Sequence, residues 1–281
     1  MSSSNYIIAI PSYKRANYCN DKTLTTLHNN NIDHKKIYVY VANKEEYDLY
    51  IDVLDKQFYN KIIIGKKGLV QQREFISNEW KEGTHIVFLD DDIEKIDLTL
   101  SKFTKGKTLN EFIIFAFNQC IKYHSFIWGV YAVYNPFFRK PTKEISCDLK
   151  YIVGAFYGII NRPKLNSLKL NITSSNGQKE DVERTIKYFI NDGIVLRFNK
   201  IGFITKYYGK EGGLGRFEDR IKPMKDASLL LQKKYPDYGK IKIRKNGMYE
   251  FVLNKIPSNK ECNQNITKNN KIKKNKTLKK H

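Results

Sequence analysis

Cysteine, histidine and long apolar runs are all scarce in this chain of 281 residues. The four cysteines, Cys19, Cys120, Cys147 and Cys262, lie far apart without a C-x-x-C pair, and the five histidines form no pair at metal-ligand spacing. The sequence therefore lacks the ligand pattern of a zinc site, and we interpret the cysteines as structural. The longest purely apolar run, Phe112 to Phe117, is far shorter than the ~20 residues of a membrane-spanning helix, so we expect no span.

Several catalytic and targeting motifs are missing as well. The sequence contains no G-x-x-x-x-G-K-[ST] loop, no G-x-S-x-G and no H-E-x-x-H, which disfavours P-loop proteins, serine hydrolases and zinc hydrolases. Residues 1–10 contain no basic segment, and Pro11 ends the apolar run from Tyr6 to Ile10. We therefore expect no secretion signal and a cytoplasmic or nuclear location.

Acidic residues are few relative to basic ones. The chain has 50 Lys and Arg against 29 Asp and Glu, a net charge of +21 at pH 7. Residues 255–281 contain nine Lys and one acidic residue, Glu261, so they supply +8 and residues 1–254 supply the remaining +13 (21 − 8). Such a field attracts polyanions, namely nucleic acids, nucleotide diphosphates or acidic membranes. The alternative is that the many Lys, Asn and Ile residues reflect a biased nucleotide composition of the source.

Short apolar segments alternate with amphipathic segments in the first hundred residues. The apolar segments that predict strands are 6–10, 37–41, 62–64 and 86–89. The segments with helical spacing are 23–30, 47–58 and 69–80. This β-α-β-α order predicts an α/β fold with a nucleotide-binding, mostly parallel sheet and helices on both faces.

The second part of the chain has a mixed pattern that predicts an added antiparallel half. Helices are predicted at 109–124, 181–192 and 222–234. Strands are predicted at 129–134 and 151–160, as a pair within 195–207, and as a hairpin of 241–244 with 248–253 around Asn246-Gly247.

Three consecutive carboxylates, Asp90, Asp91 and Asp92, follow the fourth predicted strand. Ligands of open α/β sheets bind outside the carboxyl ends of the strands, so a site is expected here. Side chains alternate along an extended segment, so Asp90 and Asp92 should share one side, with Asp91 on the other. Paired carboxylates suit Mg²⁺ or Mn²⁺, with a substrate phosphate completing the shell. The alternative is an acidic turn that caps the next helix.

Basic and aromatic side chains follow two other predicted strands. Pro11, Ser12, Tyr13, Lys14 and Arg15 leave the first strand with one aromatic ring and two cations, suited to stacking a base and holding negative charge. Lys66, Lys67 and Arg73 follow the third strand, at the same edge of a parallel sheet. Each cation alone would be interpreted as a solvent-exposed charge. Because these cations follow successive strands at one edge of the sheet, together they indicate a contact surface for phosphate.

These segments resemble, in order, the GT-A fold of nucleotide-sugar-dependent glycosyltransferases with its D-x-D motif. The residues that carry the resemblance are Pro11 to Arg15, Gly68 to Arg73, Asp90 to Asp92, Val153 to Gly158 and Glu180 to Arg184. The chain is most similar to the TET/JBP-associated glycosyltransferase family, which occurs in viruses, phages and some eukaryotes and is linked to glucosylation of hydroxymethylated bases. The similarity covers Tyr6 to Arg220.

The resemblance implies a role for each matching residue. Asp90 would bind the ribose or sugar of the donor and Asp92 would coordinate Mn²⁺ or Mg²⁺ on its diphosphate, with Asp91 between them. Lys14, Arg15, Lys66 and Arg73 would neutralise the leaving group. A carboxylate at Glu180-Asp181 would deprotonate the acceptor hydroxyl, and Asp181 is the preferred base. The alternative for this pair is stabilisation of a helix N-terminus.

One departure from the GT-A pattern concerns the metal shell. Many metal-dependent GT-A enzymes use a further His near the end of the catalytic domain, whereas only His281 follows His124 here. Water and phosphate, or a side chain such as Glu211, would then complete the metal shell. The glycine-rich stretch 209–215, between Lys210 and Arg216, would suit a lid over the diphosphate.

The resemblance also predicts how the chain is divided into domains. Residues 1–254 are expected to form a single GT-A-like catalytic domain, with a donor half over 1–108, an acceptor half over 109–220 and a C-terminal extension over 221–254. Residues 255–281 are expected to be a disordered Lys/Asn-rich tail.

Four functions remain open at this level. The first is a metal-dependent glycosyltransferase that moves a sugar from a nucleotide-diphosphate donor to a hydroxymethylated base in DNA, as a viral DNA-modification enzyme would. The second is the same chemistry on a protein or glycan. The third is a nucleotidyltransferase, and the fourth is a non-catalytic nucleic-acid-binding protein.

Overall fold

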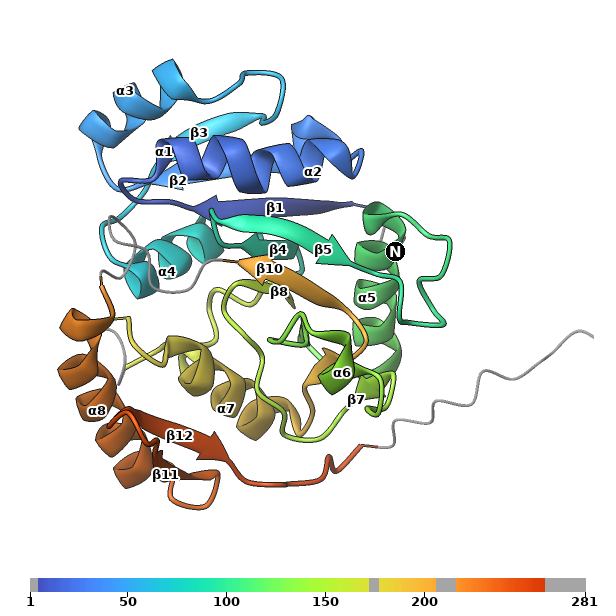
Figure 1. Cartoon of the computed structure of the whole chain (residues 1–281), viewed down its shortest axis with the longest axis vertical. Coiled ribbons are helices and arrows are strands. Elements are labelled where there is room, and N and C mark those ends of the chain that lie inside the picture. Colours follow the sequence, from blue (N-terminus) through green and yellow to red (C-terminus); the bar gives the residue numbers. More distant parts are fainter. Residues whose placement is uncertain (1–4, 172–176, 206–215, 261–281) are drawn as a thin grey trace, which may run out of the picture.

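The computed structural model describes residues 5–171, 177–205 and 216–260. Its central feature is an eight-stranded sheet with the order β3, β2, β1, β4, β8, β6, β9, β7 (Figure 1). In that order the strands are Lys61–Ile64, Ile37–Val41, Tyr6–Pro11, His85–Leu89, Phe156–Ile160, Ile127–Val130, Leu196–Phe198 and Ile145–Ser146.

The first half of this sheet is parallel and the second half is mixed. Ile8 of β1 lies opposite Ile37 of β2 on one side and Val87 of β4 on the other, both in parallel pairs, and β3 continues this arrangement. β8 is antiparallel to both β4 and β6, β9 is parallel to β6, and β7 is antiparallel to β9. The expected α/β class with a mostly parallel sheet and a mixed second half is confirmed.

Helices cover both faces of the sheet, and β1 shows how the sequence divides between them. Tyr6, Ile8 and Ile10 belong to one buried cluster and Ile7 and Ala9 to another, as alternation along a strand requires. The first cluster contains side chains from the helical stretch α1-η1-α2, from α3 and from α5; the second contains side chains from α4 and α7. These elements are Ala16–Tyr18, Cys19–Leu24, Thr25–Asn29, Lys44–Val53, Leu109–Tyr123, Leu69–Glu79 and Glu180–Asp192.

A short antiparallel ribbon crosses the first of these faces. It consists of β5 (Ile93–Asp97) and β10 (Gly202–Thr205), and Asp97 lies opposite Gly202. Arg139, the last residue of the short helix α6 (Pro136–Arg139), is fully buried and forms an ion pair with Asp97. The far end of the ribbon is thereby attached to α6.

The C-terminal residues pack as a small unit beside the sheet (Figure 1). It comprises α8 (Phe217–Lys234), β11 (Gly239–Ile243) and β12 (Tyr249–Leu253), and β11 and β12 form the expected antiparallel hairpin. Contacts continue beyond this unit, because the Leu149 backbone N–H donates to the Ile256 carbonyl at 2.9 Å. The packed chain therefore extends past residue 254, and the rest of the expected tail, 261–281, lies outside the described residues.

The remaining described elements are two short helical turns, η2 (His34–Lys36) and η3 (Asn166–Leu168). Within the three described ranges, no helix is both long enough and apolar enough to cross a bilayer.

Some element boundaries differ from those predicted. The first helical stretch begins at Ala16 rather than residue 23, because Cys19 and Leu24 also pack into the core. α3 ends at Val53 rather than residue 58, and the strands predicted at 129–134 and 151–160 are β6 and the shorter β8. The predicted strand pair within 195–207 is wrong as a pair: β9 joins β6 in the central sheet, whereas β10 pairs with β5, which was not predicted.

The buried Arg139–Asp97 ion pair yields a prediction about stability. Burial alone would raise the pKa of Asp97, but hydrogen bonds from Thr99 and Arg139 outweigh it and hold the pKa below its ordinary value. Arg139→Met should lower the free energy of unfolding at pH 7 by about 3–5 kcal/mol, because it leaves a buried carboxylate without its counter-charge.

The lowered pKa of Asp97 also predicts how the stabilisation by this ion pair changes with pH. The stabilisation by the pair is present above the unfolded-state pKa of Asp97, about 3.9, and is lost as pH falls through the lower folded-state value. The difference between wild type and variant in urea unfolding should therefore narrow from pH 7 towards pH 3. A difference that stays constant would contradict the role of the ion pair.

Candidate functional site

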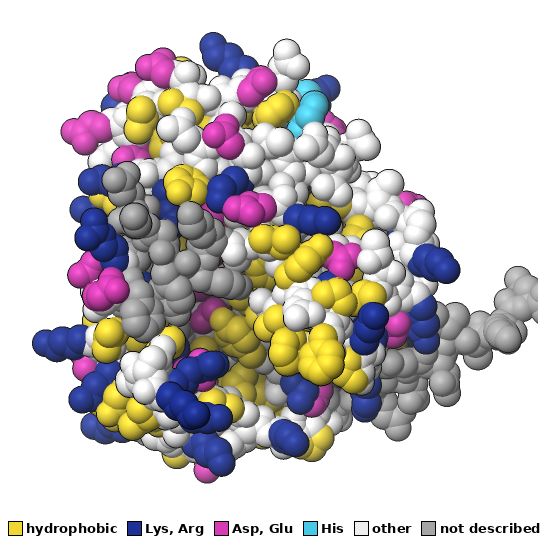
Figure 2. Space-filling view, viewed as in Figure 1, with side chains coloured by type: hydrophobic (Ala, Val, Ile, Leu, Met, Phe, Trp, Pro, Cys, Tyr) yellow, Lys and Arg dark blue, Asp and Glu magenta, His cyan; other side chains and the backbone are white. Residues whose placement is uncertain are grey.

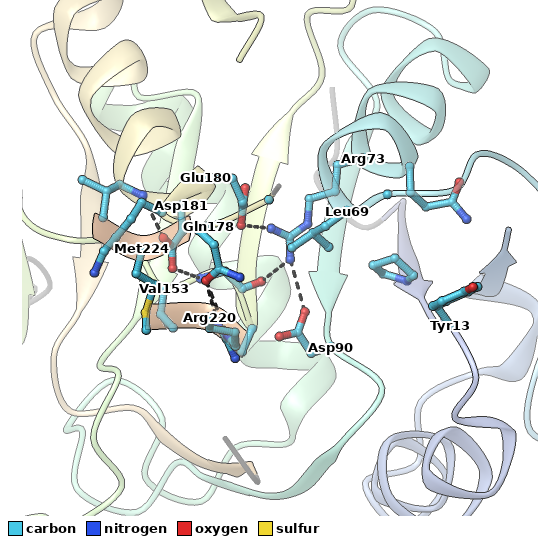
Figure 3. Close-up of a pocket in the computed structure, with 18 of the residues that line it drawn as sticks. Tyr13, Leu69, Arg73, Asp90, Val153, Gln178, Glu180, Asp181, Arg220 and Met224 are labelled. Atoms are coloured by element: carbon cyan, nitrogen blue, oxygen red, sulfur yellow. Dashed lines mark hydrogen bonds and ion pairs between the residues drawn. The ribbon is translucent and has the colours of Figure 1, made fainter. Parts of the chain in front are cut away.

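A pocket of about 720 Å³ lies between the carboxyl ends of the parallel strands and the start of α7 (Figure 3). Its floor is formed by the segments that follow β1, β3 and β4, which run parallel and therefore end at the same edge of the sheet. Its opposite wall is formed by the start of α7, by α8 and by β12. The predicted residues that line it are Pro11, Ser12, Tyr13, Arg15, Lys66, Arg73, Asp90, Asp91, Asp92, Glu180 and Asp181.

The three consecutive aspartates are held by two arginines. Arg73 Nη2 lies 3.2 Å from Asp90 Oδ1, whereas Arg15 Nη1 lies 3.1 Å from both Asp91 Oδ1 and Asp92 Oδ2. The expected alternation is therefore wrong: Asp91 and Asp92 share a partner and Asp90 has another. The reason is that β4 ends at Leu89 and the chain turns at Asp91 and Asp92 instead of continuing extended.

Further hydrogen bonds fix Asp91 and Asp92 in orientation. Ser12 Oγ donates to Asp91 Oδ2 at 2.5 Å, and the Thr205 hydroxyl donates to Asp92. Both residues are buried, whereas the Asp90 side chain is 39% exposed and faces the pocket. Asp90 is thus the member of the triplet that a ligand reaches most directly.

Burial, reinforced by neighbouring negative charge, raises the pKa of two carboxyl groups of this cluster, Asp90 and Asp91. Burial raises the pKa of Asp90 to about 7, with Asp92, Asp91 and Glu180 adding to the increase and Arg73 opposing it. Burial also raises the pKa of Asp91 to about 6, against the lowering effect of Arg15 and Ser12. The cluster therefore carries more carboxylate than its arginines neutralise, and a cation in the pocket would relieve the excess.

A buried network links the aspartates to α7. Arg73 forms an ion pair with Glu180 through Nη1 and donates from Nη2 to the Gly154 carbonyl at 2.9 Å. Arg184, one helical turn along, donates from Nη1 to the other Glu180 oxygen at 2.5 Å. The ring of Tyr157 lies under both guanidinium groups, with 3.8 Å to that of Arg184. Both oxygens of Glu180 are therefore engaged by arginines, which makes it a structural anchor.

The next carboxylate, Asp181, lies in a different environment. Its Oδ2 accepts from the Tyr151 hydroxyl and from the Gly154 N–H at 3.3 Å, and its Oδ1 accepts from the Val182 N–H at 2.9 Å. It forms no ion pair within 4.0 Å among the described residues, and it lines the pocket half-buried. Gly154 is essential to this geometry, because a Cβ there would lie 2.8 Å from Glu180 Oε1. Asp181 is oriented by neutral donors and faces the cavity (Figure 3).

The basic residues predicted after β1 and β3 are only partly in the pocket. Tyr13 lies at its edge, and the Lys67 amino group lies 5.8 Å from the centre of its ring (Figure 3). Lys66 and Lys67 are exposed and line the pocket. Lys14 does not line it: this residue has a left-handed backbone (φ 56°), and its N–H donates to Glu46 Oε2 at 2.8 Å.

The wall opposite the aspartates contains residues that the sequence analysis missed. Gln178 Oε1 accepts two hydrogen bonds of 3.2 Å from Arg220, and Met224 and Phe251 add apolar surface. Lys179 adopts a left-handed conformation (φ 61°), and burial lowers its pKa. The start of α7, α8 and β12 meet here, so no local spacing in the sequence could have grouped these residues. The left-handed conformation of Lys179, a residue other than glycine, likewise has no signal in the sequence.

The donor set fits a metal ion only in part. Within 5–171, 177–205 and 216–260, no cluster of three or more His, Cys, Asp and Glu side chains is arranged to hold one. Asp90 and Asp92 supply hard oxygen ligands in the pocket, so a divalent cation would also need phosphate and water oxygens. Glu211 and the glycine-rich stretch 209–215, considered as a ligand and as a lid, lie outside the described residues.

Comparisons with solved structures support the fold. A mycobacterial protein aligns with a TM-score of 0.52 at 9% identity, over 92% of this chain and 88% of that one. The mannosyltransferase PcManGT from Pyrobaculum calidifontis, in complex with GDP-Man and Mn²⁺, aligns with a TM-score of 0.50 at 12% identity, over 84% and 67%. Residues 1–349 of S. aureus TarS align with a TM-score of 0.46 at 14% identity; the alignment covers 81% of this chain and 65% of the length of that one.

No protein-family model and no curated protein sequence matches this chain. At the identities found among the solved structures, the likeness establishes the fold, and the expectation of a GT-A fold is confirmed.

The contrast between the two neighbouring carboxylates can be tested by stability. Glu180→Gln should lower the free energy of unfolding by about 3–5 kcal/mol, because Arg73 and Arg184 lose a shared buried counter-charge. Asp181→Asn should change it by only about 1 kcal/mol, because this side chain lies at the pocket wall, and its amide oxygen can keep the hydrogen bonds from Tyr151 and Gly154 while the one from Val182 is lost. Urea unfolding at pH 7 measures both, and equal losses would contradict the assignment.

Proposed function

We propose that this chain is a metal-dependent glycosyltransferase that transfers a sugar from a nucleotide-diphosphate donor to a hydroxyl group. The observation that carries the proposal is that one pocket on a GT-A fold contains the Asp90–Asp92 cluster on its floor and the oriented carboxylate of Asp181 on its wall. Such a pocket, with carboxylates of two distinct environments, suits a reaction that needs a cation and a base.

The donor would occupy the side formed by the segments after β1, β3 and β4. The ring of Tyr13 offers a stacking surface for a base, and Lys66 and Lys67 offer positive charge to a diphosphate. Asp90 and Asp92 would hold Mn²⁺ or Mg²⁺, and such an ion, when bound, neutralises charge on the leaving diphosphate. Burial and the neighbouring carboxylates disfavour the charged form of Asp90 and so raise its pKa, and a bound cation would favour that charged form.

Asp181 is proposed as the general base for the acceptor. Its hydrogen bonds from the Tyr151 hydroxyl and the Gly154 N–H hold the carboxylate in one orientation without an ion pair. A carboxylate free of arginine partners remains available to accept a proton from the acceptor hydroxyl. Glu180, the alternative candidate, is held by two arginines and is assigned a positioning role.

For the acceptor, we propose a hydroxymethylated base in DNA. The support is electrostatic: residues 1–254 alone carry +13, and neutralisation of backbone phosphates gives affinity that is independent of sequence. A glycan or protein acceptor would not require this charge.

The direct test incubates the full chain with Mn²⁺, a panel of nucleotide sugars and DNA with or without hydroxymethylated bases. The expected result is a gain of one hexose mass on the hydroxymethylated DNA only, measured by mass spectrometry. Release of nucleoside diphosphate without mass gain on either DNA would agree with a glycosyltransferase. It would contradict the DNA acceptor and favour a glycan or protein acceptor. Turnover of nucleoside triphosphates without sugar transfer would identify a nucleotidyltransferase instead.

Two substitutions separate the proposed roles. Asp92→Asn should abolish the Mn²⁺-dependent part of nucleoside-diphosphate binding in calorimetry, because it removes a hard ligand. Asp181→Asn should keep that binding and lower the transfer rate by 10²-fold or more, as loss of a general base does. Glu94→Gln, an exposed carboxylate just beyond the triplet that pairs with Lys22, is the matched control and should change neither. Wild-type binding and transfer in Asp92→Asn would refute the metal assignment.

A further inference from the structure

Two phenylalanines of α6 are exposed, and α6 lies on the face shown in Figure 2. Phe137 is 75% exposed and Phe138 is 51% exposed, and their rings pack edge to face with 5.2 Å between the centres. Hydrophobic side chains gather over α6 in this view, with Lys and Arg side chains beside them. Adjacent large aromatic side chains left in water mark an interaction surface more often than isolated apolar residues do.

The turn that carries these rings is firmly anchored. Arg139 forms the buried ion pair with Asp97 and donates from Nη1 to the Lys200 carbonyl at 2.8 Å. Lys200 Nζ donates in return to the Arg139 carbonyl at 3.0 Å, and Asn135 Oδ1 accepts from the Phe137 N–H at 3.0 Å. The rings are therefore held outward by a fixed backbone and do not belong to an unpacked loop.

The surroundings of the two rings are basic. Exposed lysines occur on α6's own flank, at Lys140 and Lys143, and on the segment that contains Asp97, at Lys95 and Lys102. With Phe137 and Phe138 we call them the basic aromatic patch. The acidic residues near it are engaged by other groups: Asp97 pairs with Arg139, Glu144 accepts from Ser101 Oγ at 2.7 Å, and the exposed Glu94 pairs with Lys22. The outward face therefore presents positive charge interleaved with aromatic rings.

The β5–β10 ribbon connects the patch with the pocket. At one end of it the Thr205 hydroxyl donates to Asp92 in the pocket, and at the other end Asp97 holds Arg139 of α6. Asp97 lies five positions after Asp92 in the sequence, so at ~3.3 Å per residue the two ends lie about 16 Å apart. This equals about five nucleotides at the 3.4 Å rise of one DNA strand.

We infer that the basic aromatic patch binds a nucleic-acid strand, whose bases stack on Phe137 and Phe138 while its phosphates contact the lysines. Aromatic rings beside cations are the recurring surface for single strands, because every base has a face for stacking and every linkage carries a charge. The inference deepens the proposed DNA acceptor, on which it rests, because a strand held at the patch would lead along the ribbon to the pocket.

The test measures fluorescence anisotropy of a labelled, unmodified single-stranded 20-mer DNA with the full chain between 50 and 200 mM salt. Phe137→Ala/Phe138→Ala should weaken binding about tenfold with an unchanged salt slope, because stacking is lost. Lys140→Glu/Lys143→Glu should weaken it at least as much and flatten the salt slope by about 1 per lysine. Lys240→Glu/Lys242→Glu on β11 makes the same charge change on another exposed surface, and it should have clearly less effect than the patch variant.

Several results would overturn the inference. One is unchanged DNA affinity in both patch variants; another is equal weakening by the patch and β11 charge reversals. Loss of binding to phosphatidylserine vesicles with unchanged DNA affinity would identify a membrane surface instead, and dissociation of a dimer by Phe137→Ala/Phe138→Ala with unchanged DNA affinity would identify a second copy.

The binding assay is independent of the proposed catalysis. It needs neither donor nor Mn²⁺, so its outcome stands even if no sugar is transferred to DNA. Conversely, donor cleavage without DNA should be the same in wild type and both patch variants, because the patch lies outside the pocket. If neither patch variant weakens DNA binding but the wild-type chain transfers sugar to DNA, the proposed function stands and only the proposed docking surface is wrong.

Discussion

The guanidinium group of Arg73 joins the two halves of this molecule. It comes from α4, which covers the parallel part of the sheet, and meets Asp90 at the end of β4, the Gly154 carbonyl and Glu180 at the start of α7. Buried ion pairs of this kind add little net stability because both charges lose water, but breaking one is costly. Their value here is geometric: the distance between the acidic floor and the opposite wall of the pocket is set by one side chain.

This constraint also explains why two neighbouring carboxylates receive different roles. Glu180 is turned towards Arg73 and Arg184 and is held by both, so its charge is balanced within the protein. Asp181, one residue further along α7, points about 100° around the helix and accepts its hydrogen bonds, among the described residues, from neutral donors. The anchor fixes the start of the helix, and the fixed helix presents the neighbouring carboxylate to the cavity.

The β5–β10 ribbon connects the pocket with the surface around α6. At its inner end Thr205 orients Asp92, and at its outer end Asp97 holds Arg139 and with it the helix that exposes Phe137. The pocket and the basic aromatic patch therefore belong to one continuous framework, which is consistent with a long polyanionic acceptor that would contact both.

The sequence by itself determined the α/β class, the order of the first strands and the position of the acidic triplet, because alternation and helical spacing are local and the carboxyl ends of parallel strands must share an edge. Local spacing could not show that Asp91 and Asp92 share Arg15, because the turn after Leu89 depends on contacts with β1 and β10. It also could not show that β10 pairs with β5 or that Gln178 meets Arg220, since these partners are separated by long stretches of chain. Only the tertiary structure decided which carboxylates are neutralised by arginines and which face the pocket, because burial and ion pairing arise between segments and not within them.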